Sequence, residues 1–156
     1  MEIKFATTSD AAIIHDLMMQ AFIVYKNETP PSSALEETIQ SIATALEDDE
    51  QVLIGYMANQ PVAMVRFQVQ EDCIYFYRLS VIPEKQGQGI AKEILKALEV
   101  YALEQDKSLI QCKVRMSVPK NIALYQSIGY EICDEEVVYK PDGVTVKVVS
   151  MKKRFH

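Results

Sequence analysis

A glycine loop between an apolar strand and a helical segment is the stretch of this sequence best suited to chemistry. Gly87 and Gly89 stand one residue apart, where helical periodicity begins. The first N–H groups of a helix lack partners within it, and the helix dipole adds positive charge there. Because glycine has no Cβ, a bulky anion can approach its main chain. The spacing therefore predicts a loop that binds phosphate through its backbone.

Two common nucleotide-binding patterns fit this loop poorly. A P-loop ends in Gly-Lys-Ser/Thr, whereas Gly89 is followed by Ile90 and Ala91 and by no hydroxyl that could hold magnesium. A Rossmann loop needs a small residue where Lys92 stands and an acidic residue near Arg115. A nucleotide-binding domain with a degenerate loop therefore remains only as a third interpretation.

The loop resembles the coenzyme A signature of the GNAT superfamily of acetyl-CoA-dependent N-acetyltransferases, which is Gln/Arg-x-x-Gly-x-Gly/Ala. The signature and the hydrophobic-x-Val-x-Pro sequence before it match Leu79, Val81, Pro83, Gln86, Gly89 and Ala91. The resemblance implies that residues 86–91 hold the diphosphate and that main-chain groups of Leu79 and Val81 bind pantetheine and the acetyl carbonyl. The coenzyme A contacts it implies are Leu79, Val81, Gln86, Gly87, Gln88, Gly89, Ile90, Ala91 and Asn121.

A second stretch resembles the family's other motif, in which a tyrosine precedes Gly-Phe/Tyr by a fixed gap. Here Tyr125 precedes Gly129 and Tyr130. The usual asparagine of the motif would fall at Val118, so Asn121 stands about one helical turn later. The resemblance makes Tyr125 the candidate general acid for the coenzyme A thiolate, while a packing role for this residue stays open.

Composition predicts one globular domain spanning residues 1–156. Of the 156 residues 49% are hydrophobic, which suits a domain with a sizeable core. A net charge of −6 argues against a nucleic-acid partner, which would require a basic face. No apolar run approaches the roughly 20 residues of a membrane span, and the first residues lack a signal-peptide pattern. We therefore expect a cytoplasmic protein with no membrane partner, and a homodimer stays open.

Cysteine and histidine usage predicts neither a disulfide framework nor a metal site. Cys73, Cys112 and Cys133 are odd in number, far apart, and each lies in a predicted strand, so we expect buried free thiols. His15 and His156 are the two histidines, and a His-rich metal site is therefore implausible. His15 lies on the polar flank of its helix, which predicts a solvated surface residue.

Hydrophobic periodicity predicts strands alternating with helices. The expected strands are residues 3–6, 51–58, 61–70, 73–82, 108–116, 131–139 and 144–151, and the expected helices are residues 9–25, 33–46, 87–105 and a short helix from Pro119. The resemblance implies a GNAT-like mixed α/β fold: a mostly antiparallel sheet of about seven strands with one splayed parallel pair, flanked by about four helices.

Four smaller features carry local predictions. Ser33 and Glu36 have the spacing of a capping box for the second helix, after a Pro-containing loop at residues 27–33. Asn59-Gln60 is the expected two-residue hairpin turn. The acidic run at residues 47–50 is expected to be a solvated turn and is assigned no chemistry, and the basic residues 152–154 are expected to be a solvated terminus.

The strand leading into the glycine loop changes phase. Ile74 and Phe76 are apolar on one face, yet Arg78 and Ser80 follow on the same face. Such a break predicts a β-bulge. In the resembling family a bulge here splays this strand from the next, and the pantetheine arm lies in the gap.

The resemblance implies direct transfer of an acetyl group from acetyl-CoA to a primary amine of a small molecule, within a ternary complex and without a metal. A primary amine has a pKa near about 10, so a base must remove one proton before attack. Tyr77, Tyr75, Glu71 or a water chain could be that base. A ping-pong route through Cys112 is less favoured, because no cysteine occupies the acetyl position of the motif.

The acceptor is predicted only as a class. The acidic net charge, together with the aromatic residues Phe22, Tyr25, Tyr75 and Tyr77, favours a cationic small molecule as acceptor, with Phe22, Tyr25 and the following loop as candidate contacts. A protein N-terminus or lysine stays open as the acceptor. A non-catalytic acyl-CoA-binding or regulatory module on the same fold is the alternative function.

Overall fold

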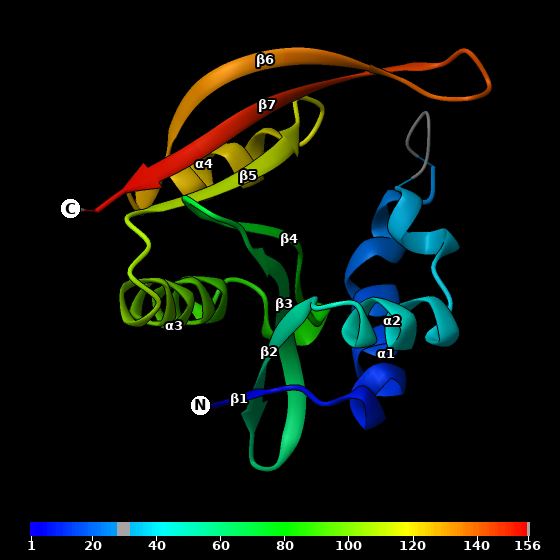
Figure 1. Ribbon diagram of the computed structural model, residues 1–156. Helices are drawn as coiled ribbons and strands as arrows, with labels where there is room; N and C mark the ends of the chain where they lie inside the picture. The colour runs from blue at the N-terminus through cyan, green and yellow to red at the C-terminus, as the bar shows by residue number, and fades with distance from the viewer. Residues whose placement is uncertain (28–31, 156) are drawn as a thin grey trace.

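The computed structural model describes residues 1–27 and 32–155, and within them seven strands form one mixed sheet in the order β1-β2-β3-β4-β5-β7-β6 (Figure 1). The strands are β1 (Glu2–Phe5), β2 (Gln51–Met57), β3 (Gln60–Val69), β4 (Ile74–Val81), β5 (Leu109–Arg115), β6 (Glu131–Tyr139) and β7 (Thr145–Arg154). The α-helices are α1 (Ala11–Phe22), α2 (Ile39–Glu47), α3 (Ile90–Glu104) and α4 (Pro119–Ser127). Residues 28–31 of the predicted 27–33 loop, and His156, lie outside the described residues.

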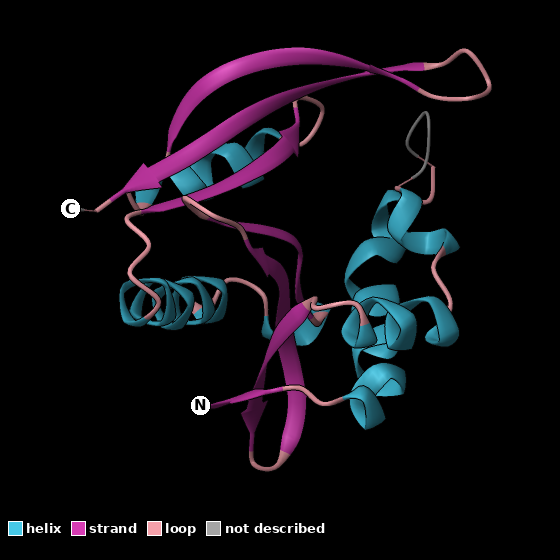
Figure 2. Cartoon of the chain, viewed as in Figure 1, coloured by secondary structure: helices cyan, strands magenta, loops and turns pink. Residues whose placement is uncertain are grey.

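Helices cover both faces of the sheet, with α1 and α2 on one side and α3 and α4 on the other (Figure 2). On α1 the buried residues Ile14, Leu17 and Met18 are three or four apart, so they form one stripe against the sheet. The stripe of α3 contains Ile94, Leu95 and Leu98, each fully buried. Every strand pair is antiparallel except β4 and β5, and the predicted mixed α/β fold is confirmed.

The parallel pair β4 and β5 separates soon after it forms. Only Ile74 with Ile110 and Tyr75 with Gln111 are in register, although β4 continues to Val81. Figure 1 shows β5, β7 and β6 turning away from the β1–β4 half of the sheet. A gap therefore opens at the carboxyl end of β4, where the chain enters the glycine loop and then α3.

The predicted bulge in β4 is confirmed. Tyr77 pairs with Arg66 and Ser80 pairs with Met64, so two residues of β4 face Val65 alone. Arg78 has a φ of +55°. A left-handed backbone costs a non-glycine residue about 1–3 kcal/mol, so surrounding contacts must hold this conformation.

Two turn predictions were wrong by a few residues. The capping box of the second helix is made by Thr38 and Ser41 rather than by Ser33 and Glu36, and α2 begins at Ile39. Residues 33–36 form a separate 3-10 turn because the Ser32 hydroxyl accepts the N–H of Ala34 instead. The hairpin between β2 and β3 turns at Ala58 and Asn59, which have φ of +51° and +64°, as the two-residue turn with the right twist requires.

Three surface predictions also need correction. Cys133 is exposed on the edge strand β6, whereas Cys73 and Cys112 are buried as predicted. His15 is only partly exposed, and its Nε2 lies 3.1 Å from the carbonyl oxygen of Glu37. The basic tail is part of β7, where Lys153 Nζ pairs with Glu99 at 2.6 Å because β7 lies against the α3 side. Within the described residues, no helix is long and apolar enough to cross a bilayer.

Candidate acyl-CoA site

The start of α3 leaves its backbone donors without a side-chain cap. Gly89 is the N-cap with φ of +79°, and no described side chain accepts a hydrogen bond from the first turn. Gly87 has φ of +78°. Space is open where a Cβ would stand at both glycines, so a ligand can reach the main chain. The loop thus presents N–H groups and the positive end of a 15-residue helix to one point.

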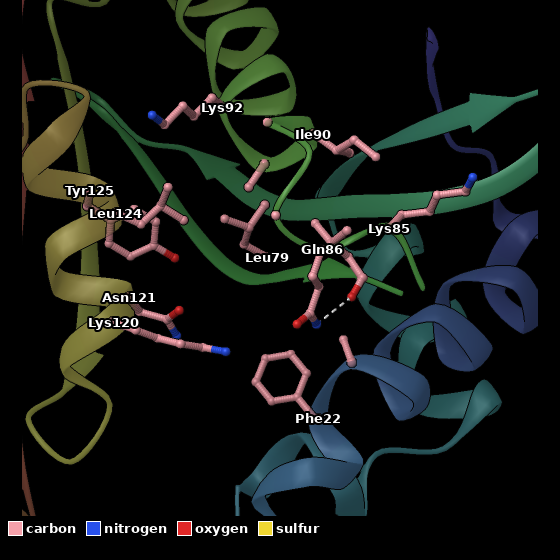
Figure 3. A pocket seen from close by; sticks show the side chains of 15 residues that line it. Phe22, Leu79, Lys85, Gln86, Ile90, Lys92, Lys120, Asn121, Leu124 and Tyr125 are labelled. Atoms are coloured by element: carbon pink, nitrogen blue, oxygen red, sulfur yellow. Dashed lines mark hydrogen bonds between the residues drawn. The ribbon is translucent and has the colours of Figure 1, made fainter. Parts of the chain in front are cut away.

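These donors open into a cavity of about 680 Å³ that is built from five segments (Figure 3). The contributing segments are α1, β4, the glycine loop, the first turn of α3, and α4. The lining residues are Ala21, Phe22, Leu79, Val81, Lys85, Gln86, Gly87, Gly89, Ile90, Ala91, Lys92, Lys120, Asn121, Leu124 and Tyr125. The volume is in the range of sites that hold cofactor-sized ligands.

The cavity brings together both sequence motifs, which are separated by some thirty residues along the chain. Of the residues predicted from them, Leu79, Val81, Gln86, Gly87, Gly89, Ile90, Ala91, Asn121 and Tyr125 line it. Gln88 is the exception: its Nε2 donates to the Glu84 carbonyl at 3.3 Å, outside the described lining. Gln86 Nε2 donates to the Val81 carbonyl at 3.1 Å, which ties the loop to the end of β4.

The Gly-Tyr pair after α4 fixes the position of Tyr125. Gly129, with φ of +101°, donates to the Gln126 carbonyl at 3.2 Å, and Tyr130 donates to the Tyr125 carbonyl at 3.0 Å. These two bonds form a Schellman cap, which requires a left-handed residue that glycine supplies readily. The cap brings the rings of Tyr125 and Tyr130 to 5.9 Å, and Phe76 packs edge-on against both.

The two tyrosines of this cluster differ in what they face. Tyr125 lines the cavity, whereas Tyr130 is 2% exposed, and its hydroxyl has no hydrogen-bond partner among the described residues. Burial raises the pKa of Tyr130 far above its ordinary value. Of these two tyrosines, Tyr125 is therefore the one placed to present a hydroxyl to a ligand in the cavity.

Three lysines that line the cavity escaped sequence analysis: Lys85, Lys92 and Lys120. They make no ion pair with any described carboxylate, and they come from three different segments. Lys92 and Lys120 lie in the first turns of α3 and α4, where the helix dipole disfavours a cation. A lysine in the first turn of a helix is unfavourable unless an anion binds nearby. This position, readable from the sequence, could have identified Lys92 and Lys120 as anion-binding residues.

The predicted acceptor residues are only partly at this cavity. Phe22 lines it, while Tyr75, Tyr77 and Glu71 are not among the described residues that do. The side chain of Tyr25 lies outside the described part of the chain. The ring centroids of Tyr75 and Tyr77 lie 5.8 Å apart with the planes tilted by 33°. Tyr77 lies on the α1 side of β4, where Arg66 contacts both its ring and Met18 of α1.

A buried ionic cluster lies on that side of β4, and it overturns the interpretation of the acidic run as a purely solvated turn. Glu50, the last residue of the run, is 5% exposed and accepts from Arg66 Nε at 2.9 Å and from the Tyr77 hydroxyl. Arg66 is 3% exposed and also donates to Glu37 at 2.9 Å. Burial alone would lower the pKa of Arg66, but Glu50 and Glu37 outweigh burial and raise it, so the guanidinium stays charged.

Tyr77 is poorly suited to act as the base. Burial, the hydrogen bond to Glu50 and the charge of Glu50 together raise the pKa of Tyr77 well above its ordinary value. The hydroxyl therefore keeps its proton and donates a hydrogen bond to Glu50. Burial likewise raises the pKa of Tyr75.

The described residues place neither a thiol nor a metal centre at this cavity. Burial and the nearby Cys133 raise the pKa of Cys112 to about 12, so its thiol is neutral and weakly nucleophilic near neutral pH. Cys112 is not among the described lining residues. Across residues 1–27 and 32–155 no three His, Cys, Asp or Glu side chains gather as metal ligands would.

In this α/β protein a strand, a glycine loop and an uncapped helix start open beside two separating parallel strands. This arrangement suits a phosphate-bearing ligand. The sequence profile of the Acetyltransferase (GNAT) family matches residues 12–130, and the chain belongs to this family. No curated protein matches the sequence.

Solved structures share the fold at low sequence identity. The ribosomal-protein-S18-alanine N-acetyltransferase of Escherichia coli superposes with a TM-score of 0.77 at 18% identity, covering 99% of this chain and 94% of that chain. A putative acetyltransferase of Salmonella typhimurium, solved with its cofactor acetyl-CoA, gives 0.76 at 17% identity, covering 100% and 94%. An N-acetyltransferase of Thermoplasma acidophilum, in complex with coenzyme A, gives 0.76 at 14% identity, covering 99% and 100%.

Proposed function

We propose that this protein is a single-domain, cytoplasmic N-acetyltransferase that transfers an acetyl group from acetyl-CoA to a primary amine. Membership of the GNAT family, whose co-substrate is acetyl-CoA, supports the acyl donor. The observation on which the proposal rests is the single cavity lined by both motifs, from Leu79 through the glycine loop to Asn121 and Tyr125.

The phosphate end of acetyl-CoA would lie at the start of α3. Backbone N–H groups of residues 87–91 and the helix dipole favour an anion there. Lys85, Lys92 and Lys120 add positive charge around the same cavity, in a chain whose net charge is −6. These lysines make no ion pair with a carboxylate among the described residues. The phosphate groups of acetyl-CoA would therefore supply their anionic partners.

The acetyl end would lie in the gap between β4 and β5. The amine nitrogen attacks the acetyl carbon, and the negative charge that develops on the carbonyl oxygen is stabilised by the Leu79 N–H. The carbon–sulfur bond then breaks, and the hydroxyl of Tyr125 donates its proton to the leaving thiolate. The proton lost by the amine passes to water, and Tyr125 regains a proton from water, which closes the cycle. Water is proposed as the acceptor of the amine proton because Tyr77 and Tyr75 have raised pKa values and are not among the described residues that line the cavity.

The acceptor is proposed to be a small molecule with a primary amine, with Phe22 as one contact. Phe22 projects from α1 toward the cavity, on the side that faces Lys120 and Gln86 (Figure 3). The acidic net charge favours a cationic acceptor on encounter. A protein amine is the second class to screen.

Calorimetry followed by a thiol-release screen tests the function. We expect acetyl-CoA and coenzyme A to bind, whereas ATP and NAD do not, and we expect at least one amine to accelerate release of the coenzyme A thiol. Binding of acetyl-CoA without thiol release for any amine would favour the non-catalytic acyl-CoA-binding module. Binding of ATP or NAD in place of coenzyme A would overturn the proposal.

A further inference from the structure

The bulge in β4 is held by side chains that lie on the far side of the strand from the cavity. Arg78, in the left-handed conformation, donates from Nε to Glu37 at 3.0 Å and from a terminal nitrogen to the Ser33 hydroxyl at 3.0 Å. Ser33 and Glu37 belong to the connection between α1 and α2. This connection therefore holds the one residue of β4 whose backbone is strained.

The residues on both sides of Leu79 are fixed in the same way. The hydroxyl of Ser80, which is 1% exposed, donates to the Arg78 carbonyl at 2.9 Å. Tyr77 donates to Glu50. Leu79 lies between these anchored residues, and its own side chain lines the cavity.

The anchor is itself tied to the centre of the sheet. Glu37 accepts from both Arg78 and Arg66, and Arg66 reaches Glu50 with its Nε. Two arginines and two glutamates thus balance in charge, and they link β3, β4 and the residue just before β2 to the α1–α2 connection. None of the four is among the described residues that line the cavity, so an effect of the cluster on the site needs no contact with the ligand and can pass through the backbone of β4.

We infer that Glu37 and Arg78 are positioning residues that set the direction of the Leu79 N–H toward the thioester carbonyl. A bulge re-aims the groups next to it, and this one would relax toward an ordinary strand if Arg78 lost its partners. The inference rests on the proposed function, because it assumes that an acetyl carbonyl lies beside Leu79. It assigns a role to side chains that never touch the ligand.

Infrared spectroscopy of the carbonyl band of bound acetyl-CoA, labelled with carbon-13 at the thioester carbonyl, tests this role. The measurement does not require that the acceptor amine be known. A hydrogen bond from Leu79 lowers the stretching frequency of the bound carbonyl relative to free acetyl-CoA. We expect Arg78→Ala and Glu37→Gln to move the band back toward the free value. With an accepted amine, kcat should fall roughly 10- to 100-fold while the KM for acetyl-CoA changes little, since misplacement by about 1 Å has effects of that size.

Two further variants separate positioning from other roles. Arg78→Gly should recover most of the band shift and of kcat relative to Arg78→Ala, because glycine adopts a positive φ without help. Glu36→Gln is the matched control, since Glu36 is exposed beside Glu37 and makes no ion pair with a described residue. It should match the wild type.

The outcomes that would overturn the inference are distinct from failure of the proposed function. Equal band positions and turnover in the wild type and Arg78→Ala would overturn the positioning role alone. So would an Arg78→Gly enzyme no better than Arg78→Ala, because the guanidinium itself would then be required. Failure of the wild type to bind acetyl-CoA in calorimetry would overturn the proposed function, and the positioning role with it.

Discussion

The two sides of β4 are built in opposite ways. At the starts of α3 and α4, with the end of α1 as its further wall, lies a cavity lined by backbone N–H groups, two glycines and lysines that have no ion-pair partner among the described residues. The α1 and α2 side holds an ionic cluster of side chains, in which Arg66 and Glu50 are nearly inaccessible to solvent. The first side is left open for a ligand, and the second is satisfied internally.

This difference predicts which substitutions each side of β4 tolerates. A group buried with its charge partner cannot lose that partner without a large cost, because water cannot replace it. A solvent-open loop that uses its backbone tolerates side-chain changes, but it does not tolerate changes that alter its conformation. Loss of a group from the buried pair Arg66 and Glu50 should therefore chiefly reduce stability, whereas changes at the cavity should chiefly reduce binding or turnover.

The largest effect is expected from Arg66→Ala on the ionic side. The change leaves Glu50 buried without its cation, so we expect the free energy of unfolding to fall by about 3–5 kcal/mol. Urea denaturation followed by circular dichroism measures it. Arg154→Ala, at an exposed arginine of β7, should change stability by less than about 0.5 kcal/mol. A small loss for Arg66→Ala would show that the two sides do not differ as argued.

The second effect separates two tyrosines on the cavity side. Tyr125→Phe should lower kcat about 100-fold, because the leaving thiolate loses its proton donor. Tyr130→Phe removes a buried hydroxyl that has no partner among the described residues, so turnover should stay unchanged and stability should stay equal or rise. Steady-state kinetics with one accepted amine measures both. Full turnover in Tyr125→Phe would remove the acid role.

A smaller effect compares two glycines with the same backbone conformation. Gly89 has φ of +79° and Gly143 has φ of +85°, and nothing lies near the place of a Cβ in either. Alanine should cost similar stability at both, about 1–2 kcal/mol. Only Gly89→Ala should raise the Kd for acetyl-CoA, by about tenfold or more, because its methyl group would occupy space beside the phosphates. Equal affinities in calorimetry would contradict a backbone phosphate site.

The smallest effect concerns the thiols. Thiolates are the reactive form, so Cys112, with a pKa of about 12, should resist iodoacetamide near neutral pH and react faster only as the pH rises toward that value. Exposed Cys133 should react first, without loss of acetyl-CoA binding. Peptide mass spectrometry identifies the labelled residue. Transfer of the acetyl group to Cys112 by acetyl-CoA alone would restore the ping-pong route.

Local patterns predicted the elements that depend on neighbours along the chain. The break in alternation at Arg78 and Ser80 predicted the bulge, because side chains alternate with a period of two along a strand. Gly129 predicted the end of α4, because a left-handed residue closes a helix. The capping box of α2 was predicted at Ser33 instead of Thr38. Both residues offer a hydroxyl, and tertiary packing starts α2 after the later one.

The sequence by itself determined the order of strands and helices, the glycine loop and the position of Tyr125 in its motif. Each of these depends on residues that are close together along the chain. Only the tertiary structure decided that Glu50 is buried against Arg66, that Tyr77 keeps its proton, and that three lysines surround one cavity. Those facts depend on side chains from separate segments meeting at a few ångströms. No periodicity along a single chain encodes such distances, because the sheet assembles them across its strands.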